Sequence, residues 1–197
     1  MQLELVTGKT SWDKGHVMYG FNRPAVNVSF EMIRGKGTGM SIDKDSFIGL
    51  LRRRTGLNID LPTVAEWIYV GRAGTTTMLN NGSSNDEDLK TLGRYKDNKN
   101  DGKGGYNDGP SAVGMYIPNK WGIYDIHGNV SEWCLDNGKN APIRNPKWGE
   151  DKVVEEQRVV MGGHWDDRFS RDQYSGWTWP TDAKKWYIGF RIVADVK

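Results

Sequence analysis

The stretch between residues 162 and 193 most constrains what this chain can fold into. Two short hydrophobic segments marked by glycine, residues 162–165 and residues 188–193, enclose a run in which large aromatic side chains alternate with charged ones. A buried core does not accept that many charges, and a solvated loop does not need that many indole and phenol rings. Because Trp, Tyr and Arg give a large contact area at a low entropic cost, the mixture predicts a surface that binds a ligand.

Composition predicts one loop-rich domain. The chain has 197 residues, enough for one substantial core. Its 25 Gly and 9 Trp favour a loop-rich fold stabilised by aromatic packing over a helical bundle. The formal net charge of +2 gives no indication of nucleic acid as a partner. No apolar run approaches the roughly 20 residues of a membrane span, and residues 1–5 do not resemble the start of a secretory signal. The single cysteine, Cys134, excludes an internal disulfide and a cysteine-rich metal site.

Local patterns predict two helices. The first begins at Asp45 and ends at Gly56, with hydrophobic side chains recurring on one face and three arginines in the last turn. The second ends at about Gly71, and its first turn carries Thr63 and Glu66 at the spacing of a capping box. We therefore expect Glu66 to cap the helix and not to act as a catalytic acid.

The remaining segments predict short strands and long loops. Strands are expected over residues 26–30, 157–162 and 188–193, where hydrophobic side chains alternate or run together between glycines. Residues 80–110 and residues 137–157 are rich in polar residues, including Asn, Asp, Gly and Lys, and are expected to be surface loops.

Five segments, in order, resemble the formylglycine-generating enzyme (sulfatase-modifying factor) superfamily, whose domain has a C-type-lectin-like fold. They are residues 24–30, 61–67 with 72–74, 119–133, 158–165 and 188–191. The resemblance implies an α+β fold with small, irregular antiparallel sheets, two helices and much ordered loop. It also implies one domain over residues 1–197, in which Trp67 and Trp133 pack inside.

The same resemblance argues against oxidation of the formylglycine type. Oxidising members bind copper through two cysteines after a Gly-Gly-Ser-aromatic motif, and those two positions hold Asp167 and Asp172 here. Carboxylates are hard oxygen donors, which cannot replace thiolates as ligands of Cu(I) or in disulfide exchange. We therefore expect no catalytic residue. The alternative is an oxidoreductase or sulfatase-modifying factor of this class with an atypical active site.

The variable proteins of diversity-generating retroelements use the same fold without catalysis. In them a C-terminal segment between a Gly-Gly-Ser-Trp-like motif and a Gly-Phe-Arg motif is diversified and forms the ligand-binding face. This chain is similar in layout, with residues 160–193 as the corresponding segment, whereas Trp165 and Phe190 are expected to pack inward. The side chains expected to face the ligand are His164, Asp166, Asp167, Phe169, Ser170, Asp172, Tyr174, Trp177, Thr178, Trp179, Trp186 and Tyr187.

The resemblance to these variable proteins implies a protein or glycan ligand, with display on a cell or phage surface as one setting for such recognition. The sequence indicates neither an oligomeric state nor a compartment.

Some members of the superfamily bind calcium near a motif that this chain carries before its Glu-Trp pair. The resemblance implies carboxylate ligands from Asp125 and Glu132 and backbone carbonyl ligands from Gly128 and Val130, a hard oxygen set that suits a structural Ca²⁺. The other interpretation is a turn closed by the side chains of Asp125 and Asn129 without an ion. Both interpretations stay open on the sequence, and no other cofactor is expected.

Overall fold

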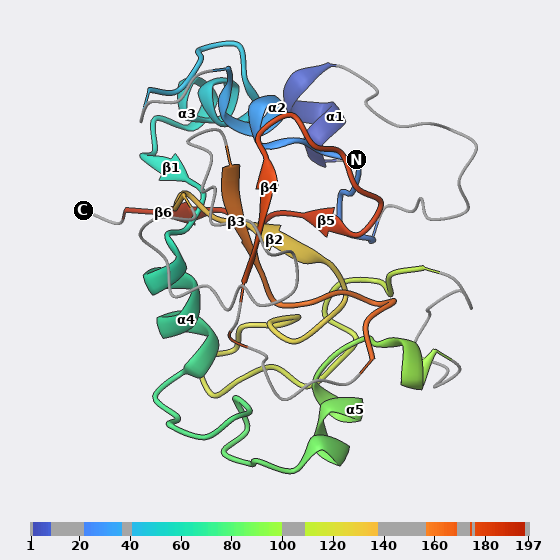
Figure 1. Ribbon diagram of the computed structural model, residues 1–197. Coiled ribbons are helices and arrows are strands. Elements are labelled where there is room, and N and C mark those ends of the chain that lie inside the picture. Colours follow the sequence, from blue (N-terminus) through green and yellow to red (C-terminus); the bar gives the residue numbers. More distant parts are fainter. Residues whose placement is uncertain are drawn as a thin grey trace.

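Two small β-sheets form the centre of the computed structural model, which describes residues 2–8, 22–36, 41–99, 109–137, 157–168, 174 and 176–195 (Figure 1). The strands are β1 (Ile59–Asp60), β2 (Ser131–Trp133), β3 (Gln157–Met161), β4 (Trp177–Pro180), β5 (Ile188–Gly189) and β6 (Val193–Ala194). The helices are α1 (Gln2–Thr7), α2 (Phe30–Arg34), α3 (Phe47–Thr55), α4 (Val64–Arg72) and α5 (Leu89–Leu92), with short 3₁₀ turns η1 (Asp86–Asp88) and η2 (Lys96–Asn98). The predicted α+β class is confirmed.

The larger sheet has the order β4-β3-β2-β5, and the smaller one pairs β1 with β6. Strand β3 is antiparallel to both of its neighbours, but β2 pairs with β5 in parallel, with Ser131 opposite Ile188. The sheet is therefore mixed, where purely antiparallel sheets were expected. The predicted strand over residues 188–193 is divided between the two sheets, because β5 joins one and β6 joins the other.

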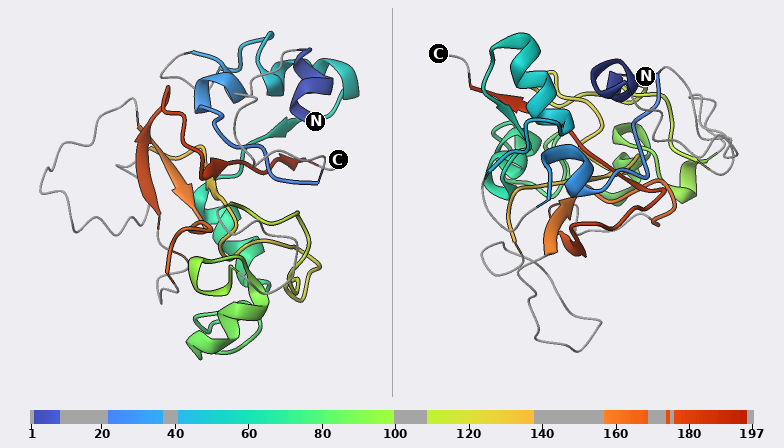
Figure 2. Two further views of the ribbon diagram at one scale, coloured as in Figure 1. Left: turned by 90° about the vertical axis from the view of Figure 1, so that its right-hand side faces the viewer. Right: turned by 90° about the horizontal axis from the view of Figure 1, so that it is seen from above.

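Helices α1, α2 and α3 gather at one end of the larger sheet, and α4 and α5 lie towards the other end, as Figure 1 and the left view of Figure 2 show. Within the described part of the chain, no helix is long and apolar enough to cross a membrane.

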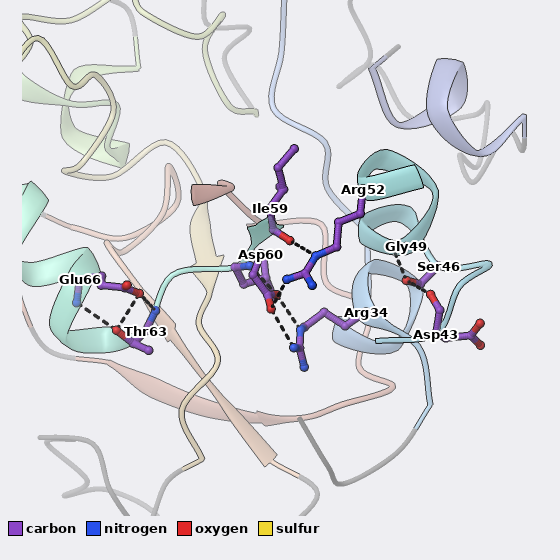
Figure 3. Close-up of polar contacts among 10 residues, drawn as sticks. Arg34, Asp43, Ser46, Gly49, Arg52, Ile59, Asp60, Thr63 and Glu66 are labelled. Atoms are coloured by element: carbon purple, nitrogen blue, oxygen red, sulfur yellow. Dashed lines mark hydrogen bonds and ion pairs between the residues drawn. The ribbon is translucent and has the colours of Figure 1, made fainter. Parts of the chain in front are cut away.

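The predicted helix caps are largely confirmed. In α4 the Glu66 N–H donates to Thr63 Oγ1 over 3.2 Å, and the Thr63 N–H donates to Glu66 Oε2 over 2.7 Å, which completes the capping box (Figure 3). Ser46, not Asp45, caps α3 by accepting from the Gly49 N–H. Helix α4 continues through Gly71 to Arg72 and ends at Ala73, which adopts the left-handed conformation with φ of 46°.

Two further predictions differ from the structure. Residues 26–30 do not form a strand, because Asn27 has a positive φ of 57°. Ser29 is the N-cap of α2, and its side chain accepts the Met32 N–H. The stretch 80–110 was predicted to be a surface loop, but its described part includes α5 and most of a small hydrophobic cluster. That cluster consists of Leu79, Leu89, Leu92 and Tyr95.

Trp67 and Trp133 pack inside, as predicted. Trp133 belongs to the main core cluster between the larger sheet, α2 and α3, and its ring meets Phe30 edge to face at 6.1 Å. Trp67 belongs to a second cluster, which α4 forms with β3 and which also contains Cys134. Burying two indoles in this way contributes a large share of the apolar area that stabilises a domain with such short strands.

An ion cluster fastens the helical end of the fold to the smaller sheet. Asp60 of β1 accepts from Arg34 Nε over 2.7 Å and from Arg34 Nη2 over 2.8 Å, and Arg52 Nη2 approaches it at 3.4 Å (Figure 3). The Arg52 Nε donates to the carbonyl oxygen of Ile59. A bidentate guanidinium–carboxylate pair fixes orientation as well as charge, so α2, α3 and β1 hold one another in place.

Candidate ligand-binding site

The site begins at the turn that follows β3. Gly162 and Gly163 both have positive φ, 95° and 70°, and a Cβ on Gly162 would lie 3.1 Å from the ring of Trp67. Glycine is therefore required at Gly162 by both the backbone conformation and the close approach. The chain leaves this turn with the Trp165 N–H bonded to the Asn129 carbonyl oxygen over 3.0 Å, which fixes the start of the next segment.

Five aromatic side chains, which we call the C-terminal aromatic cluster, gather beyond this turn. They are His164, Trp165, Trp179, Trp186 and Tyr187. The imidazole of His164 stacks on Tyr187 at 4.2 Å with an interplanar angle of 27°, and Trp186 contacts Trp165 at 4.9 Å. Trp186 and Tyr187 also meet edge to face at 4.8 Å. Such pairs stabilise one another beyond their area burial, so the cluster is one packed unit.

The neighbours of the larger sheet explain why these residues meet. Ser131 of β2 donates its N–H to the carbonyl oxygen of Tyr187, which places the residues before β5 beside the turn that follows β3. On the other side of β3 lies the edge strand β4, on which Trp179 is opposite Arg158 of β3.

Charged groups surround the cluster. Asp166 forms an ion pair with Lys96, with 3.0 Å between Oδ1 and Nζ. Asp167 Oδ2 accepts from the His164 N–H over 2.9 Å, and its Oδ1 lies 3.4 Å from His164 Nε2. Lys185 places its Nζ 4.5 Å from the centre of the Trp179 ring, within range of a cation–π contact.

Burial favours the neutral form of the His164 imidazole. Burial lowers its pKa below the ordinary 6.5, although the carboxylates of Asp167 and Asp166 act in the opposite direction. The Asp166 N–H donates to His164 Nδ1 over 3.3 Å, so this nitrogen is the acceptor and the ring proton lies on Nε2, towards Asp167. His164 is thus a fixed aromatic donor between a phenol ring and a carboxylate.

The structure places the other residues predicted to face the ligand in different surroundings. Trp177 is 48% exposed on β4, and Thr178 and Trp179 beside it are half-buried. Tyr174 does not join the cluster: its ring packs against Trp67 and His127 at 6.2 and 5.6 Å. Phe169, Ser170 and Asp172 lie outside the described residues.

Tyr174 instead packs, partly buried, against the second core cluster beside α4. The Arg72 guanidinium carbon lies 4.2 Å from the centre of its ring, and burial raises the pKa of the Tyr174 phenol to about 12.

The residues predicted to bind calcium are close together, but Glu132 is already engaged. Its Oε2 accepts from Trp67 Nε1 over 2.7 Å, and its Oε1 accepts from Arg191 Nη2 over 2.7 Å. Asp125 Oδ2 accepts from the Gly114 N–H over 2.7 Å, and burial raises the pKa of Asp125. The positively charged guanidinium of Arg191 occupies the carboxylate of Glu132 and would repel a calcium ion at the same place.

The other two predicted calcium ligands, Gly128 and Val130, lie in the buried turn between Asp125 and Glu132. Asn129 in this turn accepts the Ser111 N–H with its side-chain oxygen over 3.0 Å, a bond that ties the turn to another segment of the chain. Among the described residues there is no group of three or more His, Cys, Asp or Glu side chains that could hold a metal ion. Calcium binding stays a prediction.

The one thiol of the chain lies away from the cluster. Cys134 directly follows β2 and is fully buried among Trp67, Val159 and Met161. Burial raises the pKa of its thiol well above the ordinary 9.0. A thiol in this setting is a small hydrophobic side chain and not a nucleophile or a copper ligand.

The sequence did not predict that Lys96 lies beside the C-terminal aromatic cluster. Its N–H donates to the carbonyl oxygen of Asp167 over 3.0 Å, besides the ion pair of its side chain with Asp166. Lys96 lies about seventy positions before these partners in a polar stretch with many lysines, so no local pattern distinguishes it. The partner of Glu132, in contrast, is Arg191 of the Gly-Phe-Arg motif, and the sequence marked it because it is the only charged residue of that motif.

These features define a domain of the sulfatase-modifying kind, with a C-type-lectin-like fold. The chain belongs to the family of the sulfatase-modifying factor enzyme 1-like domain, whose model matches residues 9–196. It is 28% identical over 158 residues to the formylglycine-generating enzyme of Thermomonospora curvata, across 68% of this chain and 49% of that protein. The chain thus spans about half the length of this curated relative. The predicted superfamily is confirmed.

Solved structures share the fold. Treponema denticola variable protein 1 superposes with a TM-score of 0.68 at 20% identity, over 96% of this chain and 79% of that one. PvdO from Pseudomonas aeruginosa gives a TM-score of 0.67 at 25% identity, over 90% of this chain and 64% of that one. The resemblance to a variable protein is therefore confirmed at the level of the fold.

Proposed function

We propose that this chain is a non-catalytic ligand-recognition protein, and that the C-terminal aromatic cluster with its charged neighbours is the surface that binds. The observation that carries the proposal is the joining of His164, Trp186 and Tyr187 into one packed unit with Asp166 and Asp167 beside it. Trp186 is 36% exposed, so the unit presents an indole to a partner while its other rings hold that indole in place. Rigid aromatic anchors of this kind dominate binding free energy at interfaces.

The chemistry of the thiols supports recognition over catalysis. Copper-dependent oxidation needs a pair of accessible thiolates, whereas this chain has one cysteine, which is buried and has a raised pKa. Asp167 stands at one of the two positions and is engaged by His164. A carboxylate held by a backbone N–H and an imidazole orders the surface and carries no redox chemistry.

The likeness to Treponema denticola variable protein 1 supports the finer proposal, a variable protein of a diversity-generating retroelement. Residues 160–193 would be the diversified segment, which is held in the larger sheet beside β2. The ligand we propose is a protein or a glycan, since both offer apolar faces next to hydrogen-bonding groups, which suit indole and phenol rings. The corresponding genomic test is a near-copy of the codons for residues 160–193, differing at adenines, beside a reverse transcriptase.

The binding test compares two tryptophans of similar exposure. The purified chain is applied to a glycan array and to an array of cell-surface proteins, and each hit is measured with Trp186→Ala and with Trp121→Ala. Trp121 is 46% exposed and packs on Tyr69 of α4, away from the cluster, so its variant is the matched control. We expect Trp186→Ala to weaken binding by about 30-fold or more, as for an anchor worth about 2 kcal/mol, and Trp121→Ala to change it by less than about threefold.

Two outcomes contradict the proposal. The first is equal loss of affinity in both variants, or no binding to either array. The second is turnover of a sulfatase-type cysteine peptide by the chain with copper and oxygen, which would establish the enzymatic alternative.

A further inference from the structure

Strand β4 is an open edge of the larger sheet. The order β4-β3-β2-β5 gives β4 a single neighbour, and in the left view of Figure 2 β4 lies on the outer side of β3. Within the described part of the chain, residues 177–179 form no backbone hydrogen bond outside their pairing with β3. An edge of this kind presents unpaired N–H and C=O groups, which are a template for another strand.

The hydrogen bonds of β3 show which residue of β4 has its backbone groups turned outward. Val159 donates its N–H to the Asp136 carbonyl oxygen over 2.9 Å and accepts from the Cys134 N–H over 2.8 Å, so both of its backbone groups point towards the segment that continues β2. Thr178 is the residue of β4 opposite Val159. In an antiparallel pair, opposite residues that do not bond each other both point their N–H and C=O away from the partner strand. The N–H and C=O of Thr178 therefore point out of the sheet, at its open edge.

Two tryptophans flank Thr178 and connect this edge to the C-terminal aromatic cluster. Successive side chains of a strand alternate between its faces, so Trp177 and Trp179 lie on the same face. Trp177 is 48% exposed, and Trp179 contacts Tyr187 of the cluster edge to face at 6.3 Å. The edge of β4 is thus continuous with the surface that we propose to bind the ligand.

The edge is short and uncharged. Pro180 has no N–H, and its carbonyl oxygen accepts from the Ala183 N–H over 3.0 Å, so the edge ends there. No residue of β4 is charged. The charged side chains around it carry both signs and are Glu31, Arg158, Asp182, Lys184 and Lys185. The charges therefore favour neither an anion nor a cation. What remains is one donor and one acceptor of the same residue, the complement of one residue of an extended peptide.

We infer that β4 binds an extended peptide segment of the ligand as an antiparallel fifth strand of the larger sheet. This inference rests on the proposed function, because it names the class of ligand that the surface recognises. Antiparallel pairing is the arrangement in which a single peptide residue bonds both groups of Thr178. The side chains before and after that residue then lie opposite Trp177 and Trp179, where cross-strand neighbours are about 4.5–5.5 Å apart. The peptide motif is two large apolar side chains separated by one residue, with affinity from main-chain bonds and specificity from the alternate side chains.

The experiment selects ligands from a phage-displayed library of short random peptides on the immobilised chain. Selected peptides are synthesised, and their affinities are measured for the unmodified chain, Thr178→Pro and Thr178→Val. Proline removes the outward N–H without breaking a bond to β3, whereas valine keeps it, so Thr178→Val is the matched control. We expect Thr178→Pro to weaken the peptides by about 10-fold or more and Thr178→Val by less than about threefold.

N-methylation of the peptide tests the same bonds on the unmodified chain, which keeps the inference testable where Thr178→Pro does not fold. The N–H groups of an added strand point alternately towards β4 and away from it. Methylation of the residue opposite Thr178 should therefore weaken binding by about 10-fold or more, whereas methylation of either neighbour should change it by less than about threefold.

Several results would overturn the inference. They are selection of no peptide, equal affinity for Thr178→Pro and the unmodified chain, a loss with Thr178→Val as large as with Thr178→Pro, and N-methylation effects without alternation. Sedimentation of the free chain tests the other occupant of such an edge. A dimer that Thr178→Pro abolishes would show that β4 pairs with a second copy of this chain and not with a peptide.

The failure of this inference and that of the proposed function are distinguishable. A glycan ligand that depends on Trp186, with no peptide selected, contradicts only this inference. Peptides that depend on Thr178 but bind Trp186→Ala as well as the unmodified chain support the added strand and count against the aromatic cluster as the binding surface.

Discussion

Arg191 and Glu132 form a partly buried ion pair in which Arg191 Nη2 donates to Glu132 Oε1 over 2.7 Å and Arg191 Nε donates to Glu132 Oε2. Trp67 Nε1 donates to the same Oε2, and Arg191 Nη2 also reaches the carbonyl oxygens of Tyr124 and Asp125 at 3.3 Å. Three segments far apart in the sequence thus meet at one carboxylate. Burial by itself would lower the pKa of Arg191, but Glu132 outweighs it and raises the pKa above the ordinary value.

The ion pair predicts a strong and non-additive effect on stability. Glu132→Gln and Arg191→Met should each lower the free energy of unfolding by about 2–3 kcal/mol, less than for a fully buried pair because Arg191 is 23% exposed, since each leaves the opposite group without its partner. The double variant should lose clearly less than the sum of the two, as measured by urea unfolding. Glu87→Gln is the control, since its pair with Lys90 is exposed and should contribute less than about 1 kcal/mol. Additive losses in the double variant would show that the two residues act separately.

The local sequence predicts contacts within one helical turn, but it does not predict contacts between distant segments. The Thr63–Glu66 box was predictable because both partners lie within one helical turn. The strand expected over residues 26–30 was not formed, since Asn27 bonds its N–H to the Lys185 carbonyl oxygen, a partner that no local pattern reveals.

The candidate site follows the same rule. The two glycine-marked motifs predicted where the cluster begins and ends, but the direction of each ring in the intervening loop has no periodicity to read. Tyr174 therefore could not be recognised as an interior residue beside α4, nor Lys96 as a partner of Asp166.

The capping box of α4 predicts a modest effect. Thr63→Ala should lower the free energy of unfolding by about 1 kcal/mol, because the Glu66 N–H loses its acceptor at the helix start. Thr76→Ala, at an exposed position outside the helices, should stay within about 0.5 kcal/mol of the unmodified chain. A Thr63→Ala variant as stable as this control would mean that α4 is fixed by packing alone.

The contacts of Glu132 also predict the outcome of chelation. Because Arg191 and Trp67 already engage both carboxylate oxygens, we expect dialysis against EDTA to leave the melting temperature unchanged. Calcium added back should likewise have no effect. A fall of several degrees on chelation, reversed by Ca²⁺ but not by Mg²⁺, would instead support the calcium site at Asp125, Gly128, Val130 and Glu132.

Burial of Cys134 predicts an inert thiol. Ellman's reagent should react very slowly with the native chain, because burial raises the pKa of the thiol and excludes the reagent. In denaturant it should rapidly titrate one thiol per chain, in agreement with the single cysteine of the sequence. Rapid reaction of the native chain would show that Cys134 is accessible and would reopen thiol chemistry for this protein.

The neutral imidazole of His164 predicts a dependence of stability on pH. Since burial lowers the pKa of His164 below 6.5, the unfolded chain takes up a proton at a higher pH than the folded chain does. The contribution of His164 to stability is therefore complete above about pH 6.5 and is lost as the pH falls through the lower, folded-state pKa. His164→Gln cannot be protonated, so the stability difference between the unmodified chain and this variant should shrink or reverse across that window. Asp166, Asp167 and Tyr187 also face the ring and are present in both chains, so the difference between the chains includes the interaction of His164 with the two carboxylates. Urea unfolding of the two chains between pH 7.5 and pH 4.5 measures the difference, and a constant offset throughout would show that His164 is not held neutral by the cluster.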